Sequence, residues 1–225
     1  MKLQCIARQV IDIAANHSEI AYAKRDTKAD GSVFASFHFI DWETLQHRPV
    51  SEGVFLQMKF GNLGACVADA LGEPFSCRAA PLPDGGCAVL RTDSMLCLFR
   101  PDGSMGTQFF LGYRDGPAYD LVSDGNGGIW FTVPTRDAIA LFSLHRREME
   151  LRVGGTGMFT RPMGISKTGN DLFVSCKGGV KTLLLPSYEP GMSIPVDEPF
   201  EKYVSVFQRR FLWMDDGLFT EKISG

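Results

Sequence analysis

Few residues in this sequence combine the types and the spacing that catalysis requires. Two acids, two cations and a methionine occupy comparable points along the chain, to within about one residue: Asp12, Arg78, Asp120, Met163 and Lys202. In such a mixed set, Asp12 and Asp120 are expected to pair with Arg78 or to accept hydrogen bonds from backbone turns. The same positions could instead serve chemistry if the fold brings them together.

The common catalytic motifs are missing from the sequence. There is no Gly-x-Ser-x-Gly elbow, no His-Glu-x-x-His pair and no Walker loop. His17 and His145 are expected in turns, His47 in a loop and His38 in the third strand of its unit. A solvated histidine at such a place has no expected catalytic role.

Two other groups of residues resemble metal sites only superficially. The run Asp-Gly-Asn-Gly at 124–127 lacks the later carboxylates of a calcium-binding EF-hand and predicts a hairpin turn. The six cysteines form no Cys-x-x-Cys pair. Cys77, Cys87 and Cys97, ten residues apart, are expected on successive strands as packing residues.

The elements that must position these residues are short β-strands. Between 120 and 155, apolar runs at 129–133, 138–143 and 149–153 follow a shorter run at 119–122, with turn residues between them. Four strands in about forty residues is the size of one β-propeller blade.

The same unit recurs along the chain. Equivalent strands begin at Cys87, Ile129, Leu172 and Phe211, at spacings of 42, 43 and 39 residues, and each follows a proline that precedes a shorter strand: Pro74, Pro117, Pro162 and Pro199. Ile20 starts the equivalent strand of a first unit, which is lengthened by an insertion of about 25 residues. Within the first unit, 54–60 is expected to be a strand and 65–71 a short helix.

These units predict an all-β, single-domain β-propeller (1–225) with five blades of four antiparallel strands. The units are approximately 10–72, 73–112, 113–155, 156–197 and 198–225, the last completed by 1–9. The N-terminal strand at 3–8 is expected to close the ring, because a ring left open would expose edge strands.

Two segments resemble known propeller repeats. Residues 124–132, D-G-N-G-G-I-W-F-T, resemble the D-G-N-x-W-F-T core of virginiamycin B lyase-like repeats. Residues 161–165, continuing to 170–174, resemble the P-x-G-I-x…G-x-L-Y-V pattern of NHL and SMP-30-type repeats. The resemblance covers about 117–175, and more weakly 74–112. It implies the architecture but not an activity, because such repeats serve lactonases, lyases and binding scaffolds.

The resemblance also implies what the channel could do. In these propellers the first strand of each blade lines the channel, which would place Asp12, Arg78 and Asp120 there. SMP-30-type lactonases hold a channel metal with Glu, Asn and Asp, and virginiamycin B lyases need a histidine and Mg²⁺. This sequence offers two acids, lacks the E-G-P-x-W start and has no histidine on an expected inner strand. A divalent metal such as Ca²⁺ or Mg²⁺ is therefore expected only under the alternative of a metal-dependent lactonase or lyase.

The favoured hypothesis is a non-enzymatic module that binds a protein through its inter-blade loops, with no metal or other cofactor. The loops at 112–117 and 157–162 carry Tyr113, Arg114, Phe159 and Arg161, and the insertion begins near Trp42. Tyr, Trp and Arg are common interface anchors, although these aromatic residues could simply cover the blade ends. An inhibitor or immunity-type partner would fit, but nothing in the sequence selects one. A glycan binder with one pocket per blade is disfavoured because the blades are divergent.

Composition narrows the partners and the compartment. A net charge of −3 gives no basic surface for nucleic acid or anionic membrane. No apolar run approaches the roughly 20 residues of a membrane span, and the N-terminus lacks the apolar stretch of a secretory signal. Cysteines without a pairing pattern are typical of reduced thiols, so a cytoplasmic location is expected.

Overall fold

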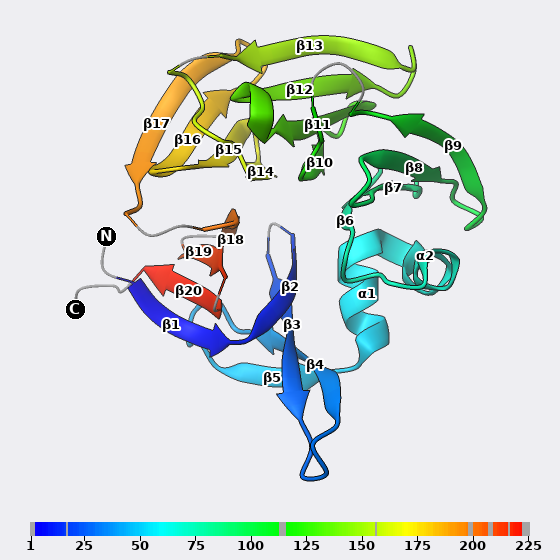
Figure 1. The fold of residues 1–225 in the computed structure, drawn as a ribbon, viewed down its shortest axis with the longest axis vertical. Coiled ribbons are helices and arrows are strands. Elements are labelled where there is room, and N and C mark those ends of the chain that lie inside the picture. Colours follow the sequence, from blue (N-terminus) through cyan, green and yellow to red (C-terminus); the bar gives the residue numbers. More distant parts are fainter. Residues whose placement is uncertain are drawn as a thin grey trace.

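Five four-stranded antiparallel sheets are arranged in a ring, which confirms the predicted five-bladed propeller (Figure 1). The computed structural model describes residues 3–16, 18–112, 116–155, 157–197, 200–206, 209–215 and 217–221. Among these residues, no helix is long and apolar enough to cross a membrane.

Each blade runs from an inner strand at the channel to an outer strand at the rim. Blade 1 is β2 (Val10–Ala15), β3 (Ile20–Thr27), β4 (Val33–Ile40) and β5 (His47–Val50); blade 2 is β6 (Arg78–Pro81), β7 (Cys87–Leu90), β8 (Met95–Phe99) and β9 (Met105–Phe110); blade 3 is β10 (Leu121–Ser123), β11 (Gly128–Val133), β12 (Ala138–Ser143) and β13 (Glu148–Gly154); blade 4 is β14 (Gly164–Thr168), β15 (Asp171–Cys176), β16 (Gly179–Leu184) and β17 (Glu189–Pro195); blade 5 is β18 (Lys202–Val206), β19 (Arg209–Met214), β20 (Gly217–Glu221) and β1 (Leu3–Arg8).

Blade 3 shows why the repeat folds as it does. Every residue of β11 and β12 is buried, as expected for strands covered on both faces by neighbouring blades. Asp124 makes the turn between β10 and β11, because its Oδ1 accepts the N–H groups of Asn126 at 2.6 Å and Gly128 at 2.8 Å. The hairpin turn predicted at 124–127 is confirmed, and Trp130 packs against residues of blade 4.

The N-terminal strand closes the ring as predicted. β1 pairs antiparallel with β20, from Leu3 opposite Glu221 to Arg8 opposite Gly217. This pairing covers the outer edge of β20, so that blade 5 is built from both ends of the described chain.

The insertion in blade 1 is helical, and the strand predicted at 54–60 is wrong. The chain forms α1 (Glu52–Phe60), the 3₁₀ turn η1 (Gly61–Leu63) and α2 (Gly64–Leu71). The Ser51 hydroxyl caps α1 by accepting the N–H of Val54 at 3.4 Å, while Glu52 and Lys59 complement the helix dipole at the two ends. Helix capping therefore overrides the β-type composition of this apolar run.

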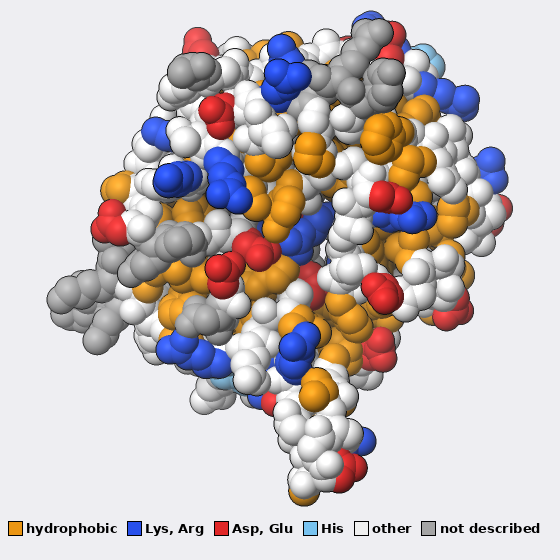
Figure 2. All heavy atoms as spheres, viewed as in Figure 1, with side chains coloured by type: hydrophobic (Ala, Val, Ile, Leu, Met, Phe, Trp, Pro, Cys, Tyr) orange, Lys and Arg blue, Asp and Glu red, His pale blue; other side chains and the backbone are white. Residues whose placement is uncertain are grey.

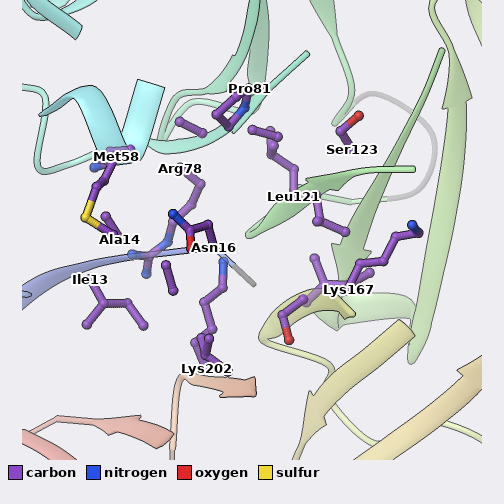
Figure 3. A pocket seen from close by; sticks show the side chains of 18 of the residues that line it. Ile13, Ala14, Asn16, Met58, Arg78, Pro81, Leu121, Ser123, Lys167 and Lys202 are labelled. Carbon is purple, nitrogen blue, oxygen red and sulfur yellow. The ribbon is translucent and has the colours of Figure 1, made fainter. Parts of the chain in front are cut away.

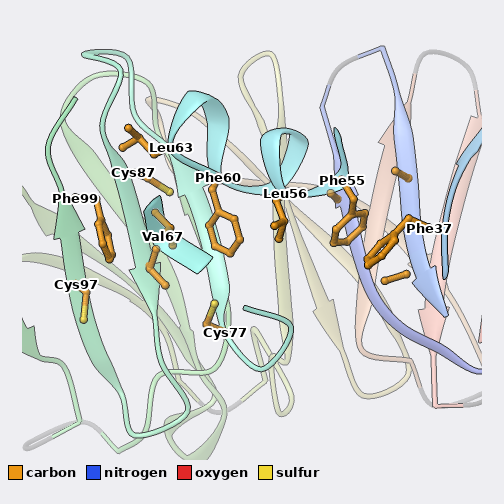
Figure 4. Packing of buried hydrophobic residues seen from close by; sticks show 14 residues of the cluster. Phe37, Phe55, Leu56, Phe60, Leu63, Val67, Cys77, Cys87, Cys97 and Phe99 are labelled. Carbon is orange, nitrogen blue, oxygen red and sulfur yellow. The ribbon is translucent and has the colours of Figure 1, made fainter. Parts of the chain in front are cut away.

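The two helices fill the space between blades 1 and 2. Phe55, Leu56 and Phe60 of α1 lie between Phe37 of blade 1 and the buried cysteines of blade 2 (Figure 4). α1 contacts both inner strands, β2 and β6. Cys77, Cys87 and Cys97 are buried free thiols in this cluster, and burial raises the pKa of Cys87 to about 12.

Candidate functional site

The inner strands bring the predicted channel residues together. Asp12 lies in β2, Arg78 begins β6 and Asp120 immediately precedes β10. Both aspartate residues are 1% exposed. The sequence suggested a pairing of Asp12 or Asp120 with Arg78, but neither forms one. Three other charged residues provide the partners instead: Lys59 for Asp12, Lys202 for Asp120 and Glu201 for Arg78.

Asp12 pairs with Lys59, which lies in the last turn of α1. The Lys59 ammonium donates to Asp12 Oδ2 and, at 2.6 Å, to the carbonyl oxygen of Pro74. The Ile13 N–H donates to Asp12 Oδ1 at 2.9 Å. Burial raises the pKa of Asp12, and the neighbouring Lys59 charge opposes that increase. The insertion thus supplies the cation that blade 1 needs.

Asp120 joins three blades. It belongs to blade 3, accepts from Lys202 Nζ of blade 5 at 2.8 Å and 3.1 Å, and accepts the Ile165 N–H of blade 4 at 2.9 Å. Its side chain is 2% exposed, whereas that of Lys202 is 20% exposed. The ion pair therefore presents its positive end to solvent.

Arg78 crosses the channel from blade 2 to blade 5. Its guanidinium donates to Glu201 Oε2 at 3.0 Å and lies 4.6 Å from the centre of the Trp213 ring and 5.7 Å from that of Tyr119. Burial opposes the charged form, but the carboxylates of Asp120, Asp12 and Glu201 raise the pKa of Arg78 overall. Arg78 is therefore a permanent cation at the centre of the ring.

Arg78 and Trp213 line two cavities, one toward each end of the channel. The loop-side cavity, about 370 Å³, is bounded by Ser76, Arg91 and Ala118, which belong to loops between or within blades. The hairpin-side cavity, about 290 Å³, reaches Asn16, Ser123 and Thr168, which lie at the turns after the inner strands. The space-filling view shows acidic and basic side chains around the hollow at the centre of the ring (Figure 2).

The channel charges are matched within this set: Asp12, Asp120 and Glu201 face Lys59, Lys202 and Arg78. Within the described ranges, no three His, Cys, Asp or Glu side chains lie together in a way that could hold a metal ion. The described histidines belong to other parts of the molecule. His38 stacks on Tyr22 in blade 1, His47 bonds the Tyr22 hydroxyl at 2.9 Å, and His145 lies in the turn after β12.

The predicted loop residues do not all reach the surface. Phe159 is 1% exposed and packs with Trp130 and Ile165, so its position is that of a core residue. Trp42 packs against the cluster between blades 1 and 5. Arg161 is exposed, and its N–H donates to Asp137 Oδ1 at 2.7 Å. Tyr113 and Arg114 lie outside the described residues.

Sequence reasoning missed Lys59, Tyr119, Glu201 and Trp213 as channel residues. Tyr119 directly precedes Asp120 and Glu201 directly precedes Lys202, two residues that the alignment of the repeats had selected. This neighbouring position is the sequence signal that could have identified them. Lys59 lies in the insertion, outside the repeat, so no alignment of blades could place it.

The ring, its closure by β1 and the channel at its centre define this chain as a five-bladed β-propeller. Solved structures of similar fold include virginiamycin B lyase from Staphylococcus aureus, with a TM-score of 0.52 and 10% identity over 91% of this chain and 73% of that one. A streptogramin B lyase gives 0.56 and 8% over 100% and 88%. A catalytically inactive alanine variant of the S. aureus lyase with quinupristin gives 0.51 and 10% over 92% and 74%.

At these identities the likeness shows the fold alone, and it agrees with the β-propeller architecture predicted from the repeats. No protein-family model and no curated protein sequence matches the chain.

Proposed function

We propose that this propeller is a non-enzymatic binding module whose partner is a protein that contacts the face carrying the inter-blade loops. The supporting observation is the loop-side cavity, which is lined by Tyr119, Trp213, Arg78 and Glu201. Aromatic residues and arginine dominate the energetics of protein interfaces when they lie at the centre of a concave patch. A projecting side chain of the partner would enter this cavity.

The charge pairing in the channel supports binding over catalysis. A general base or a metal ligand must be free to accept a proton or a cation when substrate arrives. Asp12 and Asp120 are instead each held by a lysine ammonium and by a backbone N–H. Breaking either pair would leave a buried charge without a partner, which costs several kcal/mol.

The experiment compares the same substitution on opposite faces. Arg91 lies at the β7–β8 turn beside the loop-side cavity, and Arg146 lies at the β12–β13 turn on the other face; their side chains are 48% and 62% exposed. With tagged protein as bait and quantitative mass spectrometry, Arg91→Glu and Tyr119→Ala should each reduce the captured partner about tenfold, the effect of roughly 1.4 kcal/mol. Arg146→Glu should capture as much as the parent protein. Equal capture by all four proteins, or an equal loss with Arg146→Glu, would contradict the proposal.

The alternative is a metal-dependent lyase or lactonase with its active site in the channel. The fold that the chain shares with the streptogramin lyases is the reason to test it. It is tested by incubating the protein with quinupristin and with simple aryl lactones in the presence of Mg²⁺, followed by mass spectrometry. We expect no ring-opened product. Turnover that disappears in Asp120→Asn would replace the binding proposal with the enzymatic one.

A further inference from the structure

We propose that the hairpin-side cavity is a binding site for a small organic carboxylate, independent of the protein-binding face on the opposite side of the ring. The cavity is lined by polar residues such as Asn16, Ser123 and Lys202 (Figure 3) and by apolar residues such as Ile13, Val122 and Val204. About 290 Å³ is at the lower end of the range for ligand pockets, which suits a small molecule with an apolar body.

The cavity has an excess of positive charge. Four cations line it, Lys59, Arg78, Lys167 and Lys202, against the single carboxylate of Asp12. Asp120 neutralises Lys202 and Glu201 neutralises Arg78, although neither carboxylate lines this cavity. Lys167 has no ion pair with any described residue. One net positive charge therefore remains, at the mouth.

The orientation of the Lys202–Asp120 pair adds to this polarity. Because the lysine side chain is 20% exposed and the carboxylate 2%, the ammonium faces the cavity while its counter-charge is buried. The Arg78–Glu201 pair has the opposite orientation, since the Glu201 side chain is 27% exposed and lines the loop-side cavity. An anion is thus favoured on the hairpin side only.

The channel already holds one carboxylate in the way that a ligand would be held. Asp120 receives the Lys202 ammonium at 2.8 Å and the Ile165 N–H at 2.9 Å. β14 is an inner strand that pairs only with β15, so alternate N–H groups along its free edge face the channel. Lys167 is two residues beyond Ile165 and therefore directs its N–H to the same edge, one step nearer the mouth.

Ser123 supplies a further donor across the mouth. Its hydroxyl oxygen accepts the Gly125 N–H at 3.2 Å, which leaves the hydroxyl proton able to donate to a ligand. Ser123 of blade 3, Lys167 of blade 4 and Lys202 of blade 5 all line the cavity. A carboxylate bound there would receive the ammonium of Lys167, the hydroxyl of Ser123 and a backbone N–H of β14, the set that anionic oxygens prefer.

The test uses benzoate, succinate, acetate and inorganic phosphate as probes at equal ionic strength, with chloride as the reference. Binding is measured by isothermal titration and by amide shifts in ¹H–¹⁵N spectra of the full chain. We expect millimolar or tighter binding of benzoate or succinate, with the largest shifts at Ile165, Lys167 and Ser123.

Two matched variants decide the site. Lys167→Gln should weaken binding of the carboxylate about tenfold, since it removes one charge-assisted contact without breaking an ion pair between described residues. Lys177→Gln, an exposed lysine of the same blade in the β15–β16 turn, should leave binding unchanged. The proposal is overturned if no carboxylate binds better than chloride, if Lys177→Gln weakens binding as much as Lys167→Gln, or if phosphate binds better than every carboxylate.

Discussion

Replacing Lys59 by methionine should destabilise the ring strongly, because the lysine neutralises a carboxylate that water does not reach. Lys59 and Asp12 side chains are 5% and 2% exposed. Methionine keeps most of the side-chain volume beside Phe60, so the substitution removes the charge and leaves the packing of α1 largely intact. Among the described residues, the Ile13 N–H is then the remaining hydrogen-bond donor to Asp12.

The magnitude follows from that burial. Removing one partner of a buried ion pair costs about 3–5 kcal/mol, because the other charge stays desolvated. In a chain of this length each kcal/mol lowers the melting temperature by about 2–4 °C, so a decrease of roughly 6–20 °C is expected. Replacing both partners, in Lys59→Met with Asp12→Asn, should recover most of this loss, since the amide oxygen can still accept the Ile13 N–H.

The loss should also depend on pH in a defined direction. Burial already raises the pKa of Asp12, and loss of Lys59 removes the charge that opposes this increase. A carboxyl whose folded pKa lies above its unfolded value near 4 stabilises the fold fully only below that value, and the contribution disappears as pH rises through the folded pKa. Lys59→Met should therefore be closest to the parent protein near pH 4–5 and furthest from it at pH 8.

Urea unfolding monitored by tryptophan fluorescence, at pH 5 and pH 8, measures all three proteins. The reasoning is refuted if Lys59→Met costs less than about 1 kcal/mol at pH 8, or if the double variant is no more stable than the single one. A loss that is larger at pH 5 than at pH 8 would likewise show that Asp12 is not the group left unpaired.

Three further predictions follow from other parts of the ring. Gly164→Ala should destabilise the protein by about 1–3 kcal/mol, because a Cβ there would lie 2.3 Å from the carbonyl oxygen of Glu201. Gly53→Ala in α1 should stabilise it by about 0.5–1 kcal/mol, because the nearest atom to the new Cβ is 4.0 Å away. Equal effects of the two variants in thermal unfolding would contradict this. Deleting residues 1–8 should leave the β20 edge unpaired and produce oligomers in light scattering, and a well-folded monomer would argue against the closure as a protective feature. Burial, with the charge of Lys24, lowers the pKa of both His38 and His47, so the unfolded chain binds more protons below about pH 6.5 and the melting temperature should fall as pH drops from 7 to 5.5. Replacing both histidines by glutamine should flatten this slope, and an unchanged slope would assign it to other groups.

The repeats were predictable from sequence because each blade is a local unit with its own apolar runs and turns. The alignment of Asp12, Arg78 and Asp120 at the channel followed from that periodicity, and the structure brings all three there. The pairings did not follow, because the partners lie far apart in the chain: 78 pairs with 201 and 120 with 202 across different blades, and 12 pairs with 59 of the insertion. Spacing within one repeat contains no information about which blade faces which across a ring.

The insertion was misjudged for a different reason. Val54, Phe55 and Phe60 gave 54–60 a strand-like composition, while the capping hydroxyl of Ser51 and the charges of Glu52 and Lys59 marked a helix. Phe159 was misjudged because an aromatic residue in a loop has the same sequence pattern whether it points to solvent or into the cluster around Trp130. Burial of a loop residue depends on neighbours from another blade.

The pairing of β1 with β20 delays the completion of blade 5 during synthesis. β1 ends at Arg8 and its partner begins at Gly217, so roughly 200 residues must be translated before the two can meet. At about 5–20 residues per second, β1 waits roughly 10–40 s after its own synthesis for its partner. Blades 1 to 4 can fold in sequence during that interval, but blade 5 is completed only when both ends of the described chain are free. Until β20 is made, the nascent chain therefore carries β1 as an unpaired strand, a candidate ligand for chaperones.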